Sequence, residues 1–172
     1  MANKVVLAFS GGLDTSFCVP WLKEKGYEVV TVFVDTRATS PAERESIRAR
    51  ALSLGAVEHV TEDASQAVWD SVVVPLVKGG QLWGGVYPLL VSDRYVIVEL
   101  ALALCDKHQT KLFAHGCTGM GNDQFRFDQK VFWRNPASVF FTGMLPLIFL
   151  FIFATIFGND EIEERGVKTT TH

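Results

Sequence analysis

The start of the sequence restricts the fold most, because an apolar run leads directly into a loop with two adjacent glycines. Lys4-Val5-Val6-Leu7 is typical of a buried strand, and Ser10-Gly11-Gly12-Leu13-Asp14-Thr15-Ser16 follows it closely. Glycines let backbone amides approach an anion without an intervening Cβ. The helix expected from about Asp14 turns its positive N-terminus toward the same point. The segment therefore predicts a phosphate-binding turn, the alternative being a glycine-containing turn without a ligand.

Strand and helix patterns alternate from residue 5 to about residue 115, which predicts an open parallel sheet with helices on both faces. We expect strands at residues 5–9, 28–34, 58–61 and 111–115, and a helix ending at Gly26. A capping box at Ser40-Pro41-Ala42-Glu43 starts a helix that ends before Gly55, and Asp63 is expected to cap the next helix. A further helix, apolar nearly all round and therefore expected to be buried, covers residues 95–104.

A second glycine-rich loop follows the strand at residues 111–115. Ligands of open parallel sheets bind outside the carboxyl ends of the strands, where neighbouring loops diverge. Both glycine-rich loops fall at such ends. Together they predict a ligand site at one edge of the sheet more strongly than either loop does alone.

Composition excludes several other classes of protein. The 172 residues carry 16 Lys and Arg against 19 Asp and Glu, a net charge of -3, so no basic surplus indicates a nucleic-acid partner. No signal peptide precedes the first strand, which favours a cytoplasmic location. Cys18, Cys105 and Cys117 have no paired spacing, so we expect neither a disulfide framework nor a metal site.

Several polar residues are expected to be structural. The charged residues of the helix after Ser40 (Arg44, Glu45, Arg48 and Arg50) are predicted to form a solvated face. His115, at the end of a strand, is expected to hold the following loop in place rather than act as a base. Cys117 is expected to be a small loop residue, since nothing marks its thiol as activated.

The second loop resembles a known family. His115-Gly116-Cys117-Thr118-Gly119-Met120-Gly121-Asn122-Asp123-Gln124-Phe125-Arg126-Phe127 is similar to a motif of argininosuccinate synthases. The Ser10 loop resembles the same family and, more widely, the N-type ATP pyrophosphatases. A third segment resembles argininosuccinate synthases, Tyr87-Pro88-Leu89-Leu90-Val91-Ser92-Asp93-Arg94-Tyr95. The resemblance covers about residues 4–130 and implies a Rossmann-like domain of the adenine nucleotide alpha-hydrolase type.

The resemblance implies ATP-dependent ligation of citrulline and aspartate through a citrullyl-adenylate, with release of pyrophosphate and AMP. ATP, with Mg²⁺, would contact Ala8, Phe9, Ser10, Gly11, Gly12, Leu13, Asp14, Thr15, Ser16 and Gly116. Within that set, Ser10, Asp14 and Thr15 would position the phosphates for catalysis. The amino-acid substrates would contact Tyr87, Ser92 and Arg126 (citrulline), Thr118 and Asp123 (aspartate), and Asn122 (both). Carboxylate recognition suits the bidentate fork of an arginine.

Two segments depart from the family pattern. Residues 35–38 replace small or glycine-containing loop residues, and Arg37 there would either crowd the adenine pocket or reach a phosphate. Residues 131–172 form a divergent tail, whose segment 139–157 has no charge and is long enough to cross a bilayer. Three readings of that tail stay open: a misread end of a longer gene, a membrane anchor, or a helix folded over the sheet edge.

Three functions remain to be separated. The first is a truncated argininosuccinate synthase nucleotide domain, lacking the family's oligomerisation region and weakly active alone. The second is a non-catalytic ATP-binding module, tethered to a membrane through residues 139–157. The third is an RNA-modifying thiolase of the same superfamily, which the absence of paired cysteines and of a basic face disfavours.

Overall fold

The computed structural model describes residues 3–80, 82–88, 93–117 and 121–157. The chain separates into two compact units, Met1–Val131 and Phe132–His172, which we describe individually. The apolar side chains of both core clusters come from the first unit, which therefore contains its own core. The predicted domain boundary at residue 130 stays a prediction.

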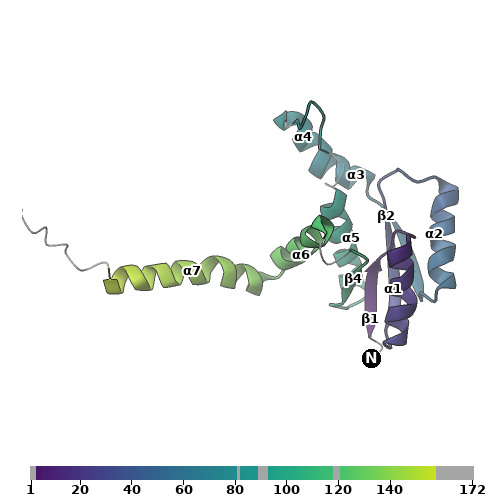
Figure 1. Ribbon diagram of the computed structural model, residues 1–172, viewed down its shortest axis with the longest axis horizontal. Coiled ribbons are helices and arrows are strands. Elements are labelled where there is room, and N and C mark those ends of the chain that lie inside the picture. The colour runs from purple at the N-terminus through teal and green to yellow at the C-terminus, as the bar shows by residue number, and fades with distance from the viewer. Residues whose placement is uncertain (1–2, 81, 89–92, 118–120, 158–172) are drawn as a thin grey trace, which may run out of the picture. The chain divides into compact units, whose positions relative to one another are not determined.

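The first unit is built on the predicted parallel sheet (Figure 1). Its strands are β1 (Lys4–Ala8), β2 (Glu28–Asp35), β3 (Glu58–Asp63) and β4 (Phe113–His115), in the order β3-β2-β1-β4. All three pairings are parallel, and Val6 of β1 aligns with Val30 of β2 and with Phe113 of β4. The chain thus adds strands on one side of β1 and then crosses to the other side for β4.

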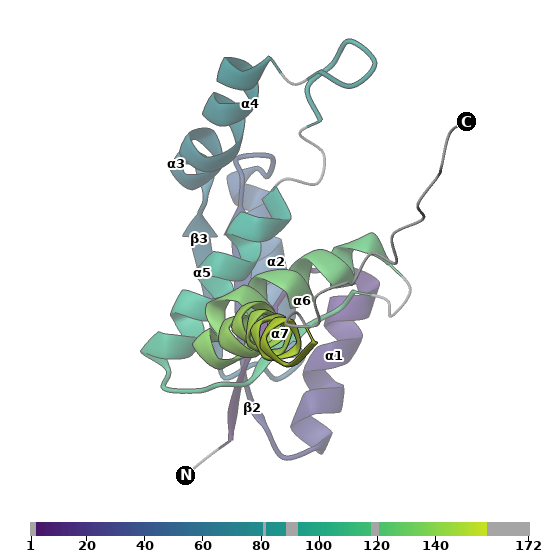
Figure 2. The same cartoon turned by 90° about the vertical axis from the view of Figure 1, so that its left-hand side faces the viewer.

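Helices cover both faces, as predicted, because side chains alternate along each strand. Val5 and Leu7 pack with α1 (Leu13–Glu24) and α2 (Pro41–Ser53). Val6 lies on the opposite face and packs with α5 (Asp93–Lys107). Figure 2 shows α3 (Ser65–Val68) and α4 (Val74–Gly79) following β3, with a π-helical turn at Trp69–Val73 between them. The helix α6 (Asn122–Arg134) follows the second glycine-rich loop.

The helix ends follow local chemistry. The predicted capping box is present: the Ser40 hydroxyl accepts a hydrogen bond from the Glu43 amide, and the Glu43 carboxylate accepts one from the Ser40 amide. Gly26 follows α1 with a φ of +86°, which a glycine adopts without strain. The helix α5 is buried on one face rather than all round, since Tyr95 and Glu99 are exposed.

The helix predicted at residues 95–104 is longer, Asp93–Lys107, and two strand boundaries differ by two residues. The strand β3 continues to Asp63, because Asp35 and Asp63 still pair in register, so Ala64 rather than Asp63 is the N-cap of α3. Asp63 instead accepts a hydrogen bond from the Ser65 amide. The strand β4 begins at Phe113 rather than residue 111, and the Leu112 amide bonds to the Thr110 hydroxyl.

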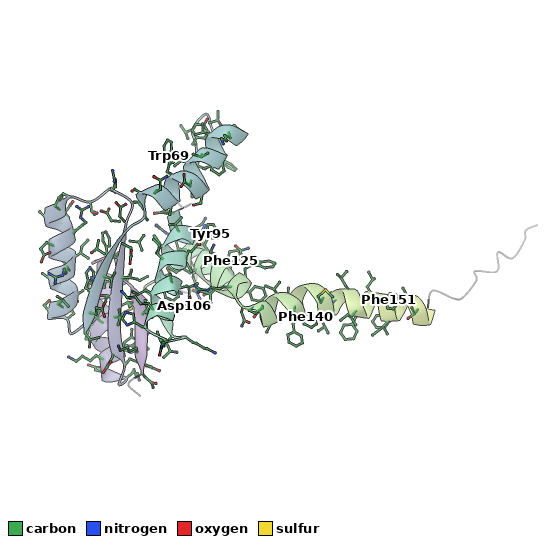
Figure 3. The ribbon with its side chains drawn as sticks, turned by 180° about the vertical axis from the view of Figure 1, so that it is seen from behind. Trp69, Tyr95, Asp106, Phe125, Phe140 and Phe151 are labelled. Atoms are coloured by element: carbon green, nitrogen blue, oxygen red, sulfur yellow. The ribbon has the colours of Figure 1, made fainter. Side chains whose placement is uncertain are left out.

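The second unit contains the predicted apolar helix, α7 (Pro136–Phe157). Figure 3 shows its side chains, with Phe140 and Phe151 labelled, extending outward from the helix. By length and composition, Pro136–Thr155 is a candidate membrane span with a mean hydropathy of 2.3, and none of its most apolar stretch is buried.

Candidate functional site

The candidate site is a cavity of about 440 Å³ at the carboxyl edge of the sheet. It lies where the loops after β1 and β4 diverge, since the strand order reverses between these two strands. Its wall includes these residues: Ala8, Phe9, Ser10, Gly12, Leu13, Asp14, Thr15, Val34, Asp35, Thr36, Ala38, Thr39, Asp93, Arg94, Ile97, His115, Gly116, Cys117, Asp123 and Phe127. Eight of the ten predicted nucleotide-binding residues are in this wall, the exceptions being Gly11 and Ser16.

The two glycines of the first loop have different reasons to be glycine. Gly11 has a φ of +75°, which disfavours any other residue. A Cβ on Gly11 would also lie 3.0 Å from Cγ1 of Ile47. Gly12 has a φ of -73°, which every residue adopts, and it is exposed at the cavity. A Cβ on Gly12 would lie 3.3 Å from the Ser10 hydroxyl oxygen, so a side chain there would meet this hydroxyl as well as any ligand that approaches the turn.

The first turn of α1 offers hydrogen-bond donors to the cavity. Gly12 is the N-cap, and in the described chain no side chain caps this turn, so its amides face outward. The hydroxyls of Ser10 and Thr15 lie 3.3 Å apart, and the Gly12 amide donates to the Ser10 hydroxyl at 3.3 Å. Such a cluster of donors at a helix N-terminus suits a phosphate.

Gly116, after β4, lies against the same turn. A Cβ on Gly116 would lie 2.8 Å from Thr15 Cγ2 and 3.2 Å from the Thr15 backbone nitrogen. A side chain at Gly116 would therefore displace the start of α1. The two glycine-rich loops converge at this contact, as the sequence predicted.

The helix α2 fixes both loops of the nucleotide side, which corrects the prediction that its charges form only a solvated face. Arg50 donates to the carbonyl of Gly11, and Arg44 donates to the carboxylate of Asp35. Arg48 and Glu45 do follow the prediction, since they are exposed and pair with each other. Sequence reasoning missed these contacts of Arg44 and Arg50, because their partners Asp35 and Gly11 lie in other segments of the chain.

Asp35 ends β2 inside the cavity wall with its side chain almost fully buried. Burial raises the pKa of this carboxyl, but hydrogen bonds from Thr39, Arg44 and the Arg37 amide outweigh it and leave the pKa below its usual value. Arg37 has a φ of +65°, and its exposed side chain lies 3.7 Å from Asp63. Arg37 is not part of the cavity wall, so its effect on the adenine pocket or a phosphate stays a prediction.

The predicted amino-acid side is only partly assembled. Asp123 lines the cavity and lies between two arginines, 3.4 Å from Arg94 and 2.9 Å from Arg126. Arg126 is therefore paired rather than turned toward the cavity, and Asn122 is exposed at the start of α6. Tyr87 follows a tight turn at Trp83–Val86 and is not in the cavity wall. The predicted residues Ser92 and Thr118 lie outside the described residues.

His115 and Cys117 support the loop after β4. The Cys117 amide donates to Nδ1 of His115 at 3.3 Å, so the neutral ring carries its proton on Nε2, facing Asp128. Burial lowers the pKa of His115, although Asp128 opposes the shift. Burial and Asp123 raise the pKa of the Cys117 thiol, so it stays protonated at neutral pH. Both findings agree with the structural roles predicted for these residues.

The chain is similar to proteins of one known family. Residues 4–141 match the family model described as the arginosuccinate synthase N-terminal HUP domain, eleven residues beyond the predicted end of the resemblance. The argininosuccinate synthase of Xanthomonas axonopodis pv. citri is 58% identical over 127 residues, covering 74% of this chain and 31% of that protein. The enzyme of the same name from Lacticaseibacillus paracasei is 39% identical over 137 residues, covering 79% and 34%.

This chain therefore spans about a third of the length of the curated relatives it matches. Among solved structures, NAD+ synthetase from Burkholderia pseudomallei has a TM-score of 0.42 at 16% identity, over 75% of this chain and 64% of that one. We draw nothing further from so distant a likeness.

The buried carboxylate of Asp35 predicts a pH dependence of stability. Its pKa is lower in the folded than in the unfolded state, so its contribution is present above about pH 4 and is lost as the pH falls below that value. Asp35→Asn should therefore lower the free energy of unfolding at pH 7. The gap in this free energy between the variant and the wild type should narrow as the pH falls toward 3. Urea unfolding of residues 1–134 from pH 3 to pH 7 measures this gap. The exposed Asp70→Asn is the control, and a gap for Asp35→Asn that is constant with pH would refute the assignment.

Proposed function

Because the chain belongs to the argininosuccinate synthase family, we propose that the cavity binds ATP and orients its α-phosphate for adenylation of citrulline. In this reaction the ureido oxygen of citrulline bonds to the α-phosphorus while the bond to pyrophosphate breaks. The amine of aspartate then displaces AMP from the citrullyl-adenylate. The observation that carries the proposal is Gly12, a glycine at the cavity that the backbone does not require.

The cavity has the two surfaces that ATP needs. The first turn of α1 provides amides for the β- and γ-phosphates, and Ser10 and Thr15 provide hydroxyls. The wall also includes apolar side chains, among them Val34 of β2, Ile97 and Phe127, which suit a purine base. Phosphate groups held by fixed donors keep the α-phosphorus in place, which is the main contribution a protein makes to such a transfer.

Mg²⁺ would be held mainly by the phosphates. In the described ranges, no cluster of three or more His, Cys, Asp or Glu side chains could hold a metal ion. Asp14 is exposed at the cavity beside the phosphate turn, whereas Asp35, Asp93 and Asp123 have arginine partners. One carboxylate plus phosphate oxygens is a usual magnesium environment. Bound in this way, the ion would neutralise charge on the leaving pyrophosphate.

Amino-acid binding requires an exchange of ion pairs. Arg126 suits the carboxylate of citrulline and Asp123 suits the amine of aspartate, yet here the two side chains are bonded to each other. The substrates would replace this pair with equivalent charge-assisted hydrogen bonds. Tyr87, Ser92, Thr118 and Asn122 keep the substrate roles that the family resemblance implies for them.

One observation favours a second candidate, a module that binds ATP without catalysis. Among the four described residues predicted to bind amino acids, only Asp123 is in the cavity wall. The nucleotide side is assembled and the amino-acid side is not. The two candidates differ in whether citrulline stimulates cleavage of ATP.

A substitution at Gly12 tests the nucleotide site. Gly12→Val keeps an allowed backbone but places a branched side chain between the amides and phosphate, so the Kd for ATP should rise about tenfold or more. Isothermal calorimetry with Mg²⁺ on residues 1–134 measures it. Equal affinity in the two proteins, with an unchanged circular dichroism spectrum, would exclude phosphate binding at this turn.

A substitution at Arg50 tests the support of this turn, because Arg50 donates a hydrogen bond to the carbonyl of Gly11. This carbonyl and the Gly12 amide belong to one planar trans peptide and point in opposite directions. Arg50 therefore holds the Gly12 amide toward the cavity. Arg50→Met should raise the Kd for ATP about fivefold while leaving adenosine binding unchanged, since a hydrogen bond is typically worth about 1 kcal/mol. Arg48→Met, two residues earlier at the surface of the same helix, is the matched control and should bind ATP normally.

An activity assay separates the two candidate functions. If the cavity adenylates citrulline, the full chain should release pyrophosphate from ATP only when citrulline is present. Arg126→Ala should abolish this citrulline-dependent release. A coupled pyrophosphate assay in detergent measures the release. Normal ATP binding without citrulline-dependent release would establish the non-catalytic module instead.

A further inference from the structure

We propose that α7 spans a lipid bilayer as a single transmembrane helix. The helix has 22 residues, and a rise of 1.5 Å per residue gives it a length of about 33 Å, close to the ~30 Å of a hydrocarbon core. Its segment Pro136–Thr155 contains no Asp, Glu, Lys or Arg. This inference is independent of the proposed function, and most of α7 lies beyond residue 141, where the family match ends.

The distribution of apolar side chains around α7 favours lipid over a protein partner. From Met144 to Phe153 every residue except Pro146 is a large apolar residue with more than a third of its surface exposed. These positions cover all sides of almost three turns. A helix that packs on a sheet, a groove or another helix needs one apolar stripe and keeps a polar side. A helix that is apolar on every side lies either in the core of a large protein or in a membrane, and none of the most apolar stretch of α7 is buried.

The residues of α7 also suit lipid better than water. Phenylalanine, isoleucine, valine and threonine are weak helix formers in water, and Gly143 and Pro146 weaken the helix further. In a bilayer, backbone groups must be satisfied within the segment, so the helix forms despite these residues. Glycine and proline are accordingly more frequent in transmembrane helices than in soluble ones.

The flanking residues give the helix a direction. Lys130 and Arg134 precede α7, and Asp160, Glu161, Glu163 and Glu164 come after it in the sequence. Within 20 residues of its ends, three basic residues precede α7 (Arg126, Lys130 and Arg134) and two follow it in the sequence (Arg165 and Lys168). Basic residues stay preferentially on the cytoplasmic side, so this slight excess favours the first unit there. The exposed Trp133 lies at the entry to the helix, where an amphipathic ring suits the lipid headgroups.

Protease protection tests the proposal on the full chain. The chain is synthesised without cells in the presence of phosphatidylcholine and phosphatidylglycerol vesicles, which are then floated, washed with carbonate and treated with trypsin from outside. Trypsin should cut after Arg134 but spare Arg165 and Lys168, leaving the fragment 135–172 for an antibody against the last residues. Detergent should abolish this protection.

Paired variants show whether the apolar surface causes insertion. Leu147→Arg with Phe151→Arg puts two charges at the middle of the bilayer and should lower the carbonate-resistant fraction at least tenfold. The same two charges at exposed positions of α2, Ser46→Arg with Ala49→Arg, should leave it unchanged. Floated chain that trypsin cuts at Arg165 would overturn the proposal in favour of surface binding. If the chain does not bind the vesicles, the proposal is wrong and α7 contacts protein instead. This holds whether the unbound chain is a soluble monomer, an oligomer or an aggregate.

Discussion

The structure depends on the pairing of β1 on both of its edges. Val6 and Leu7 are fully buried, and their strand bonds to β2 on one side and to β4 on the other. Because all the strands are parallel, the loops that leave β1 and β4 emerge at the same edge. The glycine-rich loops therefore meet although they are about a hundred residues apart in sequence, and Gly116 touches Thr15 as a result.

The helix α2 turns this edge into a site with fixed geometry. Its inner side contacts the loop after β1 through Ile47 and Arg50, and the loop after β2 through Arg44. The two loops that face a nucleotide are thus held by one rigid element of the fold. Preorganisation of this kind lets binding energy act on the ligand rather than on ordering the loops.

The fold was predictable where the chemistry is local. The capping box joins residues three apart, Gly26 ends its helix by its own conformation, and the strands carry strongly apolar runs. The ties from Arg50 to Gly11 and from Arg44 to Asp35 depend on tertiary packing, so their arginines looked like ordinary surface charges. The pairing of Asp123 with Arg126 is by contrast local, since the two residues are three apart on one helix, and the prediction missed it because both residue types were assigned to substrates instead.

That pairing has a consequence for the cost of opening the site. Asp123 lies between Arg126 and Arg94, which are 2.9 Å and 3.4 Å from its carboxylate. If a substrate carboxylate draws Arg126 away, as the proposed function requires, Asp123 keeps Arg94 as a partner of opposite sign. The exchange therefore does not leave this carboxylate without a partner, which would be costly. The second arginine acts as a spare partner that makes the pair easier to open.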